Sequence, residues 1–255
     1  MSKIALITGA GSGIGKATAK IFAKNGYSVI ITGRRIEQLN LLSETITNKY
    51  AVKVLVLNFD VRSSDEVEHA IVNLPEEWST IDILVNNAGL AKGKDPIHEG
   101  RIEHWDTMID TNVKGLLYVS RLISKKMVDQ GFGHIINVGS TAGKEVYPNG
   151  NVYCASKHAV EALTKAMRID LHNYGIRVSQ VSPGHVEDTD FALVRFDGDK
   201  ERAKIYEDFT PLNANDVSEI VYFIASQPRH VNIQDILVMG TQQANNVFID
   251  RSGRK

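Results

Sequence analysis

Cysteine, long apolar runs and an excess of either charge are all scarce in this sequence of 255 residues. A single cysteine, Cys154, excludes an internal disulfide framework and favours a reducing compartment. The apolar runs are strand-sized, as at residues 54–57, whereas a membrane-spanning helix needs about 18 apolar residues. The formal net charge is −1 and no long basic run occurs, which argues against nucleic acid or a membrane as a partner.

The N-terminal residues lack the cleavage region of a signal peptide, so we expect a cytoplasmic protein. Cys154 adjoins Tyr153 and raises the alternative of a cysteine nucleophile. No His-Asp/Asn partner pattern accompanies it, however, so a small core residue is the better interpretation. No metal site is expected.

Short apolar runs alternate with helical stretches, which predicts βαβ units in one domain, residues 1–255. The expected fold is α/β: a Rossmann-type, doubly wound, seven-stranded parallel sheet with helices on both faces. Expected strands are 3–8, 28–32, 53–58, 83–86, 134–138, 177–182 and 236–239. Expected helices are 13–25, 35–49, 65–74, 103–130, 153–174 and 216–225. Residues 187–210 break this alternation after Pro183-Gly184 and are the predicted substrate lid.

The turn after the first expected strand is rich in glycine and leads into a helix. Its glycines are Gly9, Gly11, Gly13 and Gly15. Backbone amides at a helix start, with the positive end of the helix dipole, bind pyrophosphate well. This strand–turn–helix context favours a dinucleotide site over a glycine-rich connection without a ligand.

The residues after the second expected strand discriminate between the two nicotinamide cofactors. An acidic residue there would repel a 2′-phosphate, but this chain has Gly33, Arg34 and Arg35. Two guanidiniums favour NADP over NAD, although Arg35 could simply start a solvated helix. Asp60, followed by Val61, could accept from the adenine amine or cap the next turn.

Tyr153 and Lys157 lie four residues apart in an expected helix, so both side chains project from one face. A cation beside a phenol favours the phenolate and lowers its pKa from about 10. Tyr153 is therefore a candidate proton donor and acceptor, and Lys157 its partner.

The order of these motifs resembles the short-chain dehydrogenase/reductase family over nearly the whole chain. The resemblance rests on the glycine turn, Asn86-Asn87-Ala88-Gly89, Asn112, Ser140, Tyr153-x3-Lys157 and Pro183-Gly184. It implies a catalytic tetrad of Asn112, Ser140, Tyr153 and Lys157, with Asn112 holding a water that relays protons from Lys157. It also implies cofactor contacts at Gly9, Ser12, Gly13, Ile14, Gly15, Arg34, Arg35, Asp60, Val61, Asn87, Ala88, Gly89, Tyr153, Lys157, Pro183, Gly184, Val186 and Thr189.

Longer stretches resemble one subgroup, the NADP-dependent 3-hydroxy acid dehydrogenases, also named serine or L-allo-threonine dehydrogenases. These stretches include residues 82–91, 106–112, 134–143 and 194–199. The resemblance implies small substrates with a β-hydroxyl, and reduction of malonic semialdehyde in reverse. Ser12 departs from the basic residue that many NADP-using relatives have in this turn, so Arg34 is expected to carry most of the preference.

The substrate carboxylate needs a cation, and Arg195 in the lid is the first candidate, with Lys144 and His185 as competitors. Ser140, Tyr153 and Tyr147 are expected to complete the substrate site, although Tyr147 could serve packing alone.

Two alternative functions stay open. One is a reductase of 3-oxoacyl thioesters, which the lack of a concentrated basic cluster beside the lid disfavours. The other is a non-catalytic NADP-binding regulatory protein, which the presence of Tyr153 and Lys157 disfavours. The two long expected helices predict a homotetramer, because family members commonly pair these helices across two-fold axes.

Overall fold

A computed structural model describes residues 2–204 and 208–253, which form seven strands and eight α-helices. The strands are β1 (Ile4–Ile7), β2 (Ser28–Gly33), β3 (Val54–Asn58), β4 (Ile83–Asn86), β5 (Gly133–Val138), β6 (Ile176–Pro183) and β7 (Asp235–Val238). The helices are α1 (Gly13–Lys24), α2 (Ile36–Lys49), α3 (Ser64–Val72), α4 (Ile102–Ile109), α5 (Leu116–Gln130), α6 (Asn151–Leu171), α7 (Phe191–Arg195) and α8 (Ala214–Ser226).

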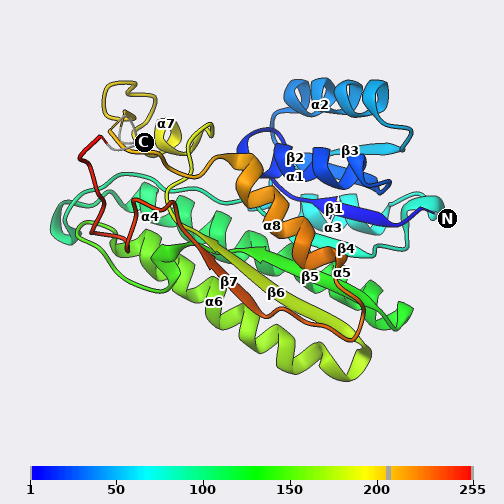
Figure 1. Cartoon of the computed structure of the whole chain (residues 1–255). Coiled ribbons are helices and arrows are strands. Elements are labelled where there is room, and N and C mark those ends of the chain that lie inside the picture. The colour runs from blue at the N-terminus through cyan, green and yellow to red at the C-terminus, as the bar shows by residue number, and fades with distance from the viewer. Residues whose placement is uncertain (1, 205–207, 254–255) are drawn as a thin grey trace.

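The strands form one parallel sheet in the order β3-β2-β1-β4-β5-β6-β7. The predicted seven-stranded, doubly wound fold is thereby confirmed, with strand ends within two residues of expectation (Figure 1). The chain runs outward from β1 through β2 to β3, then returns to place β4 on the other side of β1. Such a reversal opens a crevice at the carboxyl ends of the neighbouring strands, where ligands bind in this fold class.

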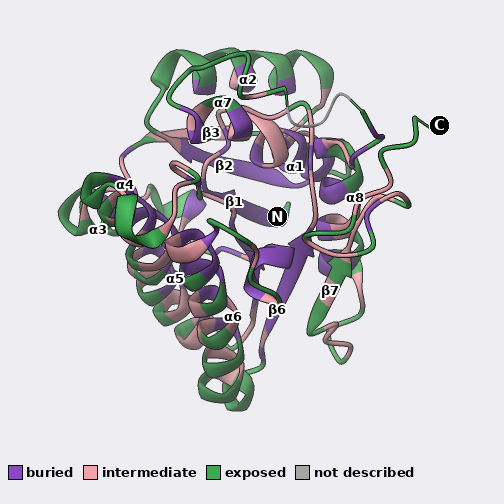
Figure 2. Cartoon of the chain, turned by 90° about the vertical axis from the view of Figure 1, so that its left-hand side faces the viewer, coloured by how far each residue is buried: buried purple, intermediate pink, exposed green. Residues whose placement is uncertain are grey.

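Two apolar layers sandwich the sheet (Figures 1 and 2). One layer packs α1, α2 and α8 against the sheet, with Phe22 and Ile31 fully buried. The other packs α3 and α5, with Leu84 and Ile123 fully buried. Because both faces are covered, strands such as β1 are apolar at every position instead of alternating.

The predicted long helix 103–130 is interrupted. Residues Asp110–Gly115 adopt a π-helical turn between α4 and α5, with Asn112 in its middle. A π-helical turn displaces the backbone and frequently marks a functional site. A second difference is α7, a short helix inside the segment 187–210 that was predicted to be irregular; residues 205–207 of that segment lie outside the described residues.

Gly15 is where α1 approaches the glycine turn most closely. A Cβ atom there would lie 2.4 Å from both the Gly9 carbonyl oxygen and the Asn87 amide nitrogen. We therefore expect Gly15→Ala to lower the free energy of unfolding by about 1–3 kcal/mol, because neighbouring backbone must shift. In the control Gly11→Ala, the nearest atom is 3.7 Å away and little change is expected. Equal losses in denaturant unfolding of both variants would contradict this packing role.

Candidate active site

The glycine turn is fixed to the end of β4 by hydrogen bonds from two residues. The Asn87 side chain donates to the carbonyls of Thr8 (2.9 Å) and Gly9 (3.2 Å). The Thr8 hydroxyl oxygen accepts from the backbone amides of Asn87 and Ala88, each at 3.0 Å. Gly9 and Gly13 have φ values of +66° and +52°, which favour glycine. The turn and the start of α1 are thus held rigidly beside the crevice.

Both arginines after β2 line the crevice, and each faces a carboxylate. Arg34 lies 3.8 Å from Asp60. Arg35 donates at 2.8 Å to Asp190 and, through its other terminal nitrogen, at 2.8 Å to the Ser12 hydroxyl. Arg35 also begins α2, so it is both a helix boundary and a cation on the glycine turn. Arg35 therefore brings a cation to the glycine turn at Ser12, a contact that the sequence did not reveal.

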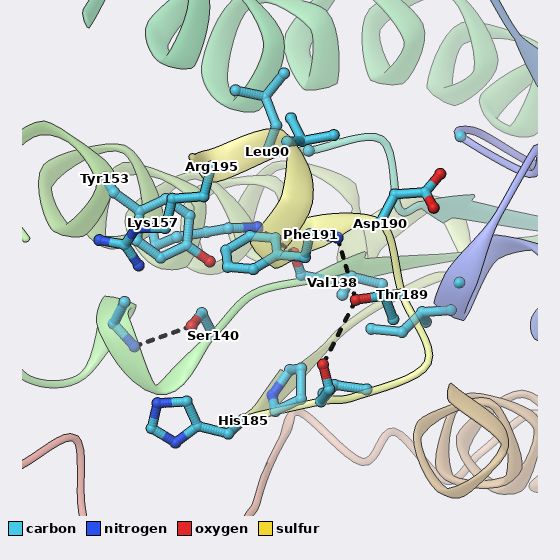
Figure 3. A pocket seen from close by; sticks show the side chains of 18 of the residues that line it. Leu90, Val138, Ser140, Tyr153, Lys157, His185, Thr189, Asp190, Phe191 and Arg195 are labelled. Atoms are coloured by element: carbon cyan, nitrogen blue, oxygen red, sulfur yellow. Dashed lines mark hydrogen bonds between the residues drawn. The ribbon is translucent and has the colours of Figure 1, made fainter. Parts of the chain in front are cut away.

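Tyr153 and Lys157 project from one face of α6 into the crevice (Figure 3). The Lys157 ammonium donates to the Val138 carbonyl at 2.9 Å, and burial lowers its pKa to about 8. Both side chains are more than nine-tenths buried. A cation in such a site acts on the phenol through a lower effective dielectric than water provides.

Asn112 and Ser140, the other two residues of the predicted tetrad, are each held by hydrogen bonds. The Asn112 amide donates to the Leu90 carbonyl and accepts from the Leu90 amide, both at 2.8 Å, and it donates to Ser156 at 3.0 Å. These bonds hold the π-helical turn against the loop after β4. The Ser140 oxygen accepts from the Ala142 amide at 3.1 Å, which caps a short helical turn, and Ser140 also lines the crevice (Figure 3).

Arg195 reaches the same end of the crevice from α7. It is 7% exposed, donates to the Gly93 carbonyl (3.0 Å) and to the Tyr147 hydroxyl (3.1 Å), and packs against the rings of Tyr147 and Tyr153. The described residues provide it with no carboxylate partner. A buried cation without an anion is costly, so an anionic group placed here would be stabilised.

Further cations stand at the mouth of the crevice. Lys94 is exposed, Arg251 packs on the Phe209 ring at 5.2 Å, and Phe209 packs on the His185 ring at 5.7 Å. Burial lowers the pKa of His185, and the surrounding positive charges lower it further. The prediction that no basic cluster lies beside the lid is therefore wrong. The cations of this cluster come from separate segments of the chain, so no continuous stretch of the sequence reveals them.

Lys144, a predicted competitor for the carboxylate, is engaged elsewhere. Its ammonium pairs with Glu161 at 3.1 Å and with Asp235, and it is absent from the residues that line the crevice. Cys154 is 1% exposed, and burial raises the pKa of its thiol, as suits a core residue.

Within residues 2–204 and 208–253, no group of three or more His, Cys, Asp or Glu side chains is arranged to hold a metal ion. No helix in that part of the chain is both long and apolar enough to span a membrane.

The glycine turn, Arg34, Arg35, Tyr153, Lys157 and Arg195 border one cavity of about 1180 Å³, slightly above the usual range for ligand pockets. The residues predicted from the sequence to bind cofactor or substrate line it, with three exceptions. Gly15 packs beneath the turn, Asn112 acts from behind Leu90, and Lys144 pairs with carboxylates elsewhere. Sequence reasoning missed Lys94, Thr111, Asp190, Phe191 and Arg251, which have no motif to mark them. A rigid glycine turn at a helix start, with two guanidiniums beside it, fits a dinucleotide that carries an extra phosphate.

This combination of fold and site defines an oxidoreductase of the short chain dehydrogenase family, and the chain belongs to that family. The family's sequence model matches residues 3–199.

Similar proteins share most of their length with this chain. It is 45% identical over 242 residues to the NADP-dependent 3-hydroxy acid dehydrogenase YdfG of Salmonella typhi, covering 94% of this chain and 96% of that protein. It is 44% identical over 254 residues to sulfoacetaldehyde reductase 2 of Chromohalobacter salexigens, covering 98% and 100%. The solved closed form of serine dehydrogenase complexed with NADP+ superposes with a TM-score of 0.91 at 43% identity, covering 94% of this chain and 96% of that one.

Proposed function

We propose that this chain is an NADP-dependent dehydrogenase of small 3-hydroxy acids, of the serine, L-allo-threonine and 3-hydroxypropionate type, and reduces malonic semialdehyde in reverse. One observation carries the choice of an acid: Arg195 is a buried cation without a described carboxylate partner, and it packs on the ring of Tyr153. The identity to 3-hydroxy acid dehydrogenases over 94% of the chain supports the same class.

In the oxidation, Tyr153 is the proton acceptor. Its phenolate oxygen takes the proton of the substrate β-hydroxyl, while the nicotinamide, when bound, supplies the hydride acceptor. Ser140 donates a hydrogen bond to the same substrate oxygen and orients it. Lys157 stabilises the phenolate with its charge and passes the proton onward, with Asn112 holding the backbone that shapes the exit.

The cofactor would bind along the part of the cavity that the glycine turn borders. The glycine turn and the start of α1 would hold the pyrophosphate, Asn87, Ala88 and Gly89 would follow the sheet edge, and Lys157 would hold the ribose. The 2′-phosphate would lie between Arg34 and Arg35. The carboxylates of Asp60 and Asp190 keep these guanidiniums near the cavity until the phosphate takes their place.

The arginine pair predicts a cofactor switch. Replacing Arg34 or Arg35 by Gln should weaken NADP binding about tenfold to a hundredfold, because a charge-assisted contact of about 1.5–3 kcal/mol is lost. NAD binding should change little. Arg62→Gln is the matched control, because Arg62 pairs with Asp60 but does not line the cavity. Fluorescence titration measures both affinities, and equal losses for the two cofactors would show that these arginines only support the fold.

The single catalytic domain of residues 1–255 includes a lid at residues 187–210. The described part of the lid docks on the loop after β4 through paired backbone and side-chain bonds. The Gly93 amide donates to the Arg195 carbonyl at 2.9 Å, and the Arg195 side chain donates back at 3.0 Å. Lys92 and Asp197 add an ion pair at 2.5 Å. Arg195 thus joins the lid to the loop after β4.

The assembly we propose is a cytoplasmic homotetramer. Leu117 on α5 and Ile169 on α6 are exposed, which is consistent with paired helices, and Phe248 is 70% exposed near the C-terminus. Light scattering at micromolar protein should give four times the chain mass of 28.2 kDa. A mass of one chain would contradict this arrangement.

Reduction of 3-oxoacyl thioesters is the second candidate, since the cations at the mouth remove the reason that disfavoured it. The depth of Arg195 beside Tyr153 favours a small acid, because a thioester has no carboxylate at that position. A non-catalytic NADP-binding role is the third.

A panel of NADP-linked oxidations tests the proposal. L-serine, L-allo-threonine, 3-hydroxypropionate and 3-hydroxyisobutyrate are compared by kcat/KM, with malonic semialdehyde and acetoacetyl-CoA in reverse. The proposal expects the acids to be oxidised and malonic semialdehyde to outperform the thioester. The opposite ranking supports the thioester reductase, and no turnover at all supports the non-catalytic role.

A further inference from the structure

Positive charge at the substrate end of the cavity exceeds what a simple hydroxy acid needs. Lys94, Arg195 and Arg251 all line it, and Lys204 stands at the same mouth. Among the described carboxylates, only Asp208 pairs with one of these three, through Arg251. A substrate with one carboxylate would neutralise Arg195. It would leave Lys94 with no anion among the described residues, and Arg251 with Asp208 alone.

The three cations belong to one site although they come from three distant segments. Arg195 binds the carbonyl of Gly93, the residue before Lys94. Arg251 reaches the same end through Phe209, whose ring packs on His185. The ammonium of Lys94 is partly shielded from water, which lowers its pKa, and the charges of Arg195 and Arg251 lower that pKa further. Asp95 follows Lys94 in the chain, but no described carboxylate forms an ion pair with the Lys94 ammonium.

Depth separates the cations into two positions. Arg195 is buried against Tyr147 and Tyr153, next to the proposed proton acceptor. Lys94 and Arg251 are exposed at the rim, and the Arg251 side chain is 46% exposed. An anion at the rim would therefore lie on the solvent side of the substrate, at the end opposite the carboxylate on Arg195.

From this arrangement we infer that Lys94 and Arg251 form a second anion subsite, and that the preferred substrates are 3-hydroxy acids, or the matching 3-oxo acids, with a second acidic group at the opposite end. This inference rests on the proposed function, because Arg195 must hold the first carboxylate. The rim cations would also attract such dianions to the mouth from solution, an effect that salt screens.

The test compares 3-hydroxyglutarate with its monoamide, which keeps the first carboxylate and replaces the second by a neutral group of the same shape. With NADP+, wild-type kcat/KM should favour the dianion about tenfold or more, the usual size of a charge-assisted contact. Lys94→Gln and Arg251→Gln should each bring the ratio of the two substrates toward one. The control Lys165→Gln removes a charge that does not line the cavity, and its ratio should equal that of wild type.

Binding of unreactive glutarate and glutaramate, measured by calorimetry on protein saturated with NADP+, separates two kinds of failure. If neither hydroxy acid is oxidised but glutarate binds more tightly than glutaramate, the proposed function fails and the subsite stands. If the monoamide and simple 3-hydroxy acids are oxidised as well as the dianion, the subsite is wrong and the proposed function stands. Better reduction of acetoacetyl-CoA than of any oxo acid would also overturn the inference, since the rim cations would then serve the phosphates of the thioester.

Discussion

Tyr153→Phe should lower kcat by about 10²–10⁴-fold, the usual contribution of general acid–base catalysis. The substitution removes only a hydroxyl and keeps the ring that packs on Phe191 at a centroid distance of 5.7 Å. Folding and NADP binding should therefore persist, as judged by circular dichroism and fluorescence titration. Tyr147→Phe is the matched control: it removes a phenol from the same cavity, one that contacts Arg195 rather than serving as the proton acceptor. It should raise KM more than it lowers kcat.

Near-full turnover of a folded Tyr153→Phe protein would show that another group accepts the proton. The same result would leave the non-catalytic interpretation without support, because turnover would still be present. Loss of NADP binding in this variant would instead mean that the hydroxyl holds the cofactor, and the loss of kcat would then say nothing about the proton.

Lys157→Met should reduce kcat/KM at least a hundredfold and shift the remaining activity to higher pH. Removing a neighbouring cation raises the pKa of an acid, so the Tyr153 phenolate forms less readily. NADP affinity should fall as well, because the ammonium is proposed to hold the ribose. Lys157→Arg keeps the charge but not the compact ammonium. The pH optimum of its activity should therefore stay closer to that of wild type than the optimum of Lys157→Met.

The same lysine makes a prediction about stability with a definite sign. Burial lowers the pKa of Lys157 from 10.5 to about 8. Between these values the unfolded chain binds more protons than the folded one, so the contribution of this group to the free energy of unfolding rises with pH. Below about pH 8 the buried charge is fully present and destabilises the protein. Lys157→Met should therefore raise the melting temperature of the cofactor-free protein at pH 7. In this variant, the increase of the free energy of unfolding with pH between pH 8 and 10 should be absent.

A lower melting temperature for Lys157→Met at pH 7 would contradict this account. It would mean that the bond from the ammonium to the Val138 carbonyl outweighs the cost of burying the charge. Lys157 would then contribute to stability as well as to catalysis.

The fold could be predicted because it depends on local patterns. Apolar runs of strand length, separated by helical stretches, specify parallel strands buried on both faces, and the glycine turn specifies where the first helix starts. The spacing of Tyr153 and Lys157 likewise fixes their shared face, because both lie in one helix. The resemblance to the short-chain dehydrogenase/reductase family, carried by the same residues, added the remaining tetrad members.

The substrate end could not be predicted in the same way. Arg195, Lys94 and Arg251 meet only because the lid, the loop after β4 and the C-terminal segment converge on one mouth. Arg35 illustrates the same limit: its position at the start of α2 is local, but its bond to Ser12 depends on the approach of two loops. The π-helical turn at Asn112 was also missed, since the apolar periodicity of residues 103–130 does not reveal one displaced backbone turn.

The most direct test of the central claim follows the hydrogen on the β-carbon. 3-Hydroxypropionate that carries deuterium at carbon 3 is incubated with the enzyme and NADP+, and the reduced cofactor is analysed by mass spectrometry. Transfer from that carbon predicts one deuterium on the nicotinamide and formation of malonic semialdehyde in equal amount. NADPH without deuterium, or no NADPH with an enzyme shown to bind NADP, would contradict the claim that this chain oxidises 3-hydroxy acids at their β-carbon.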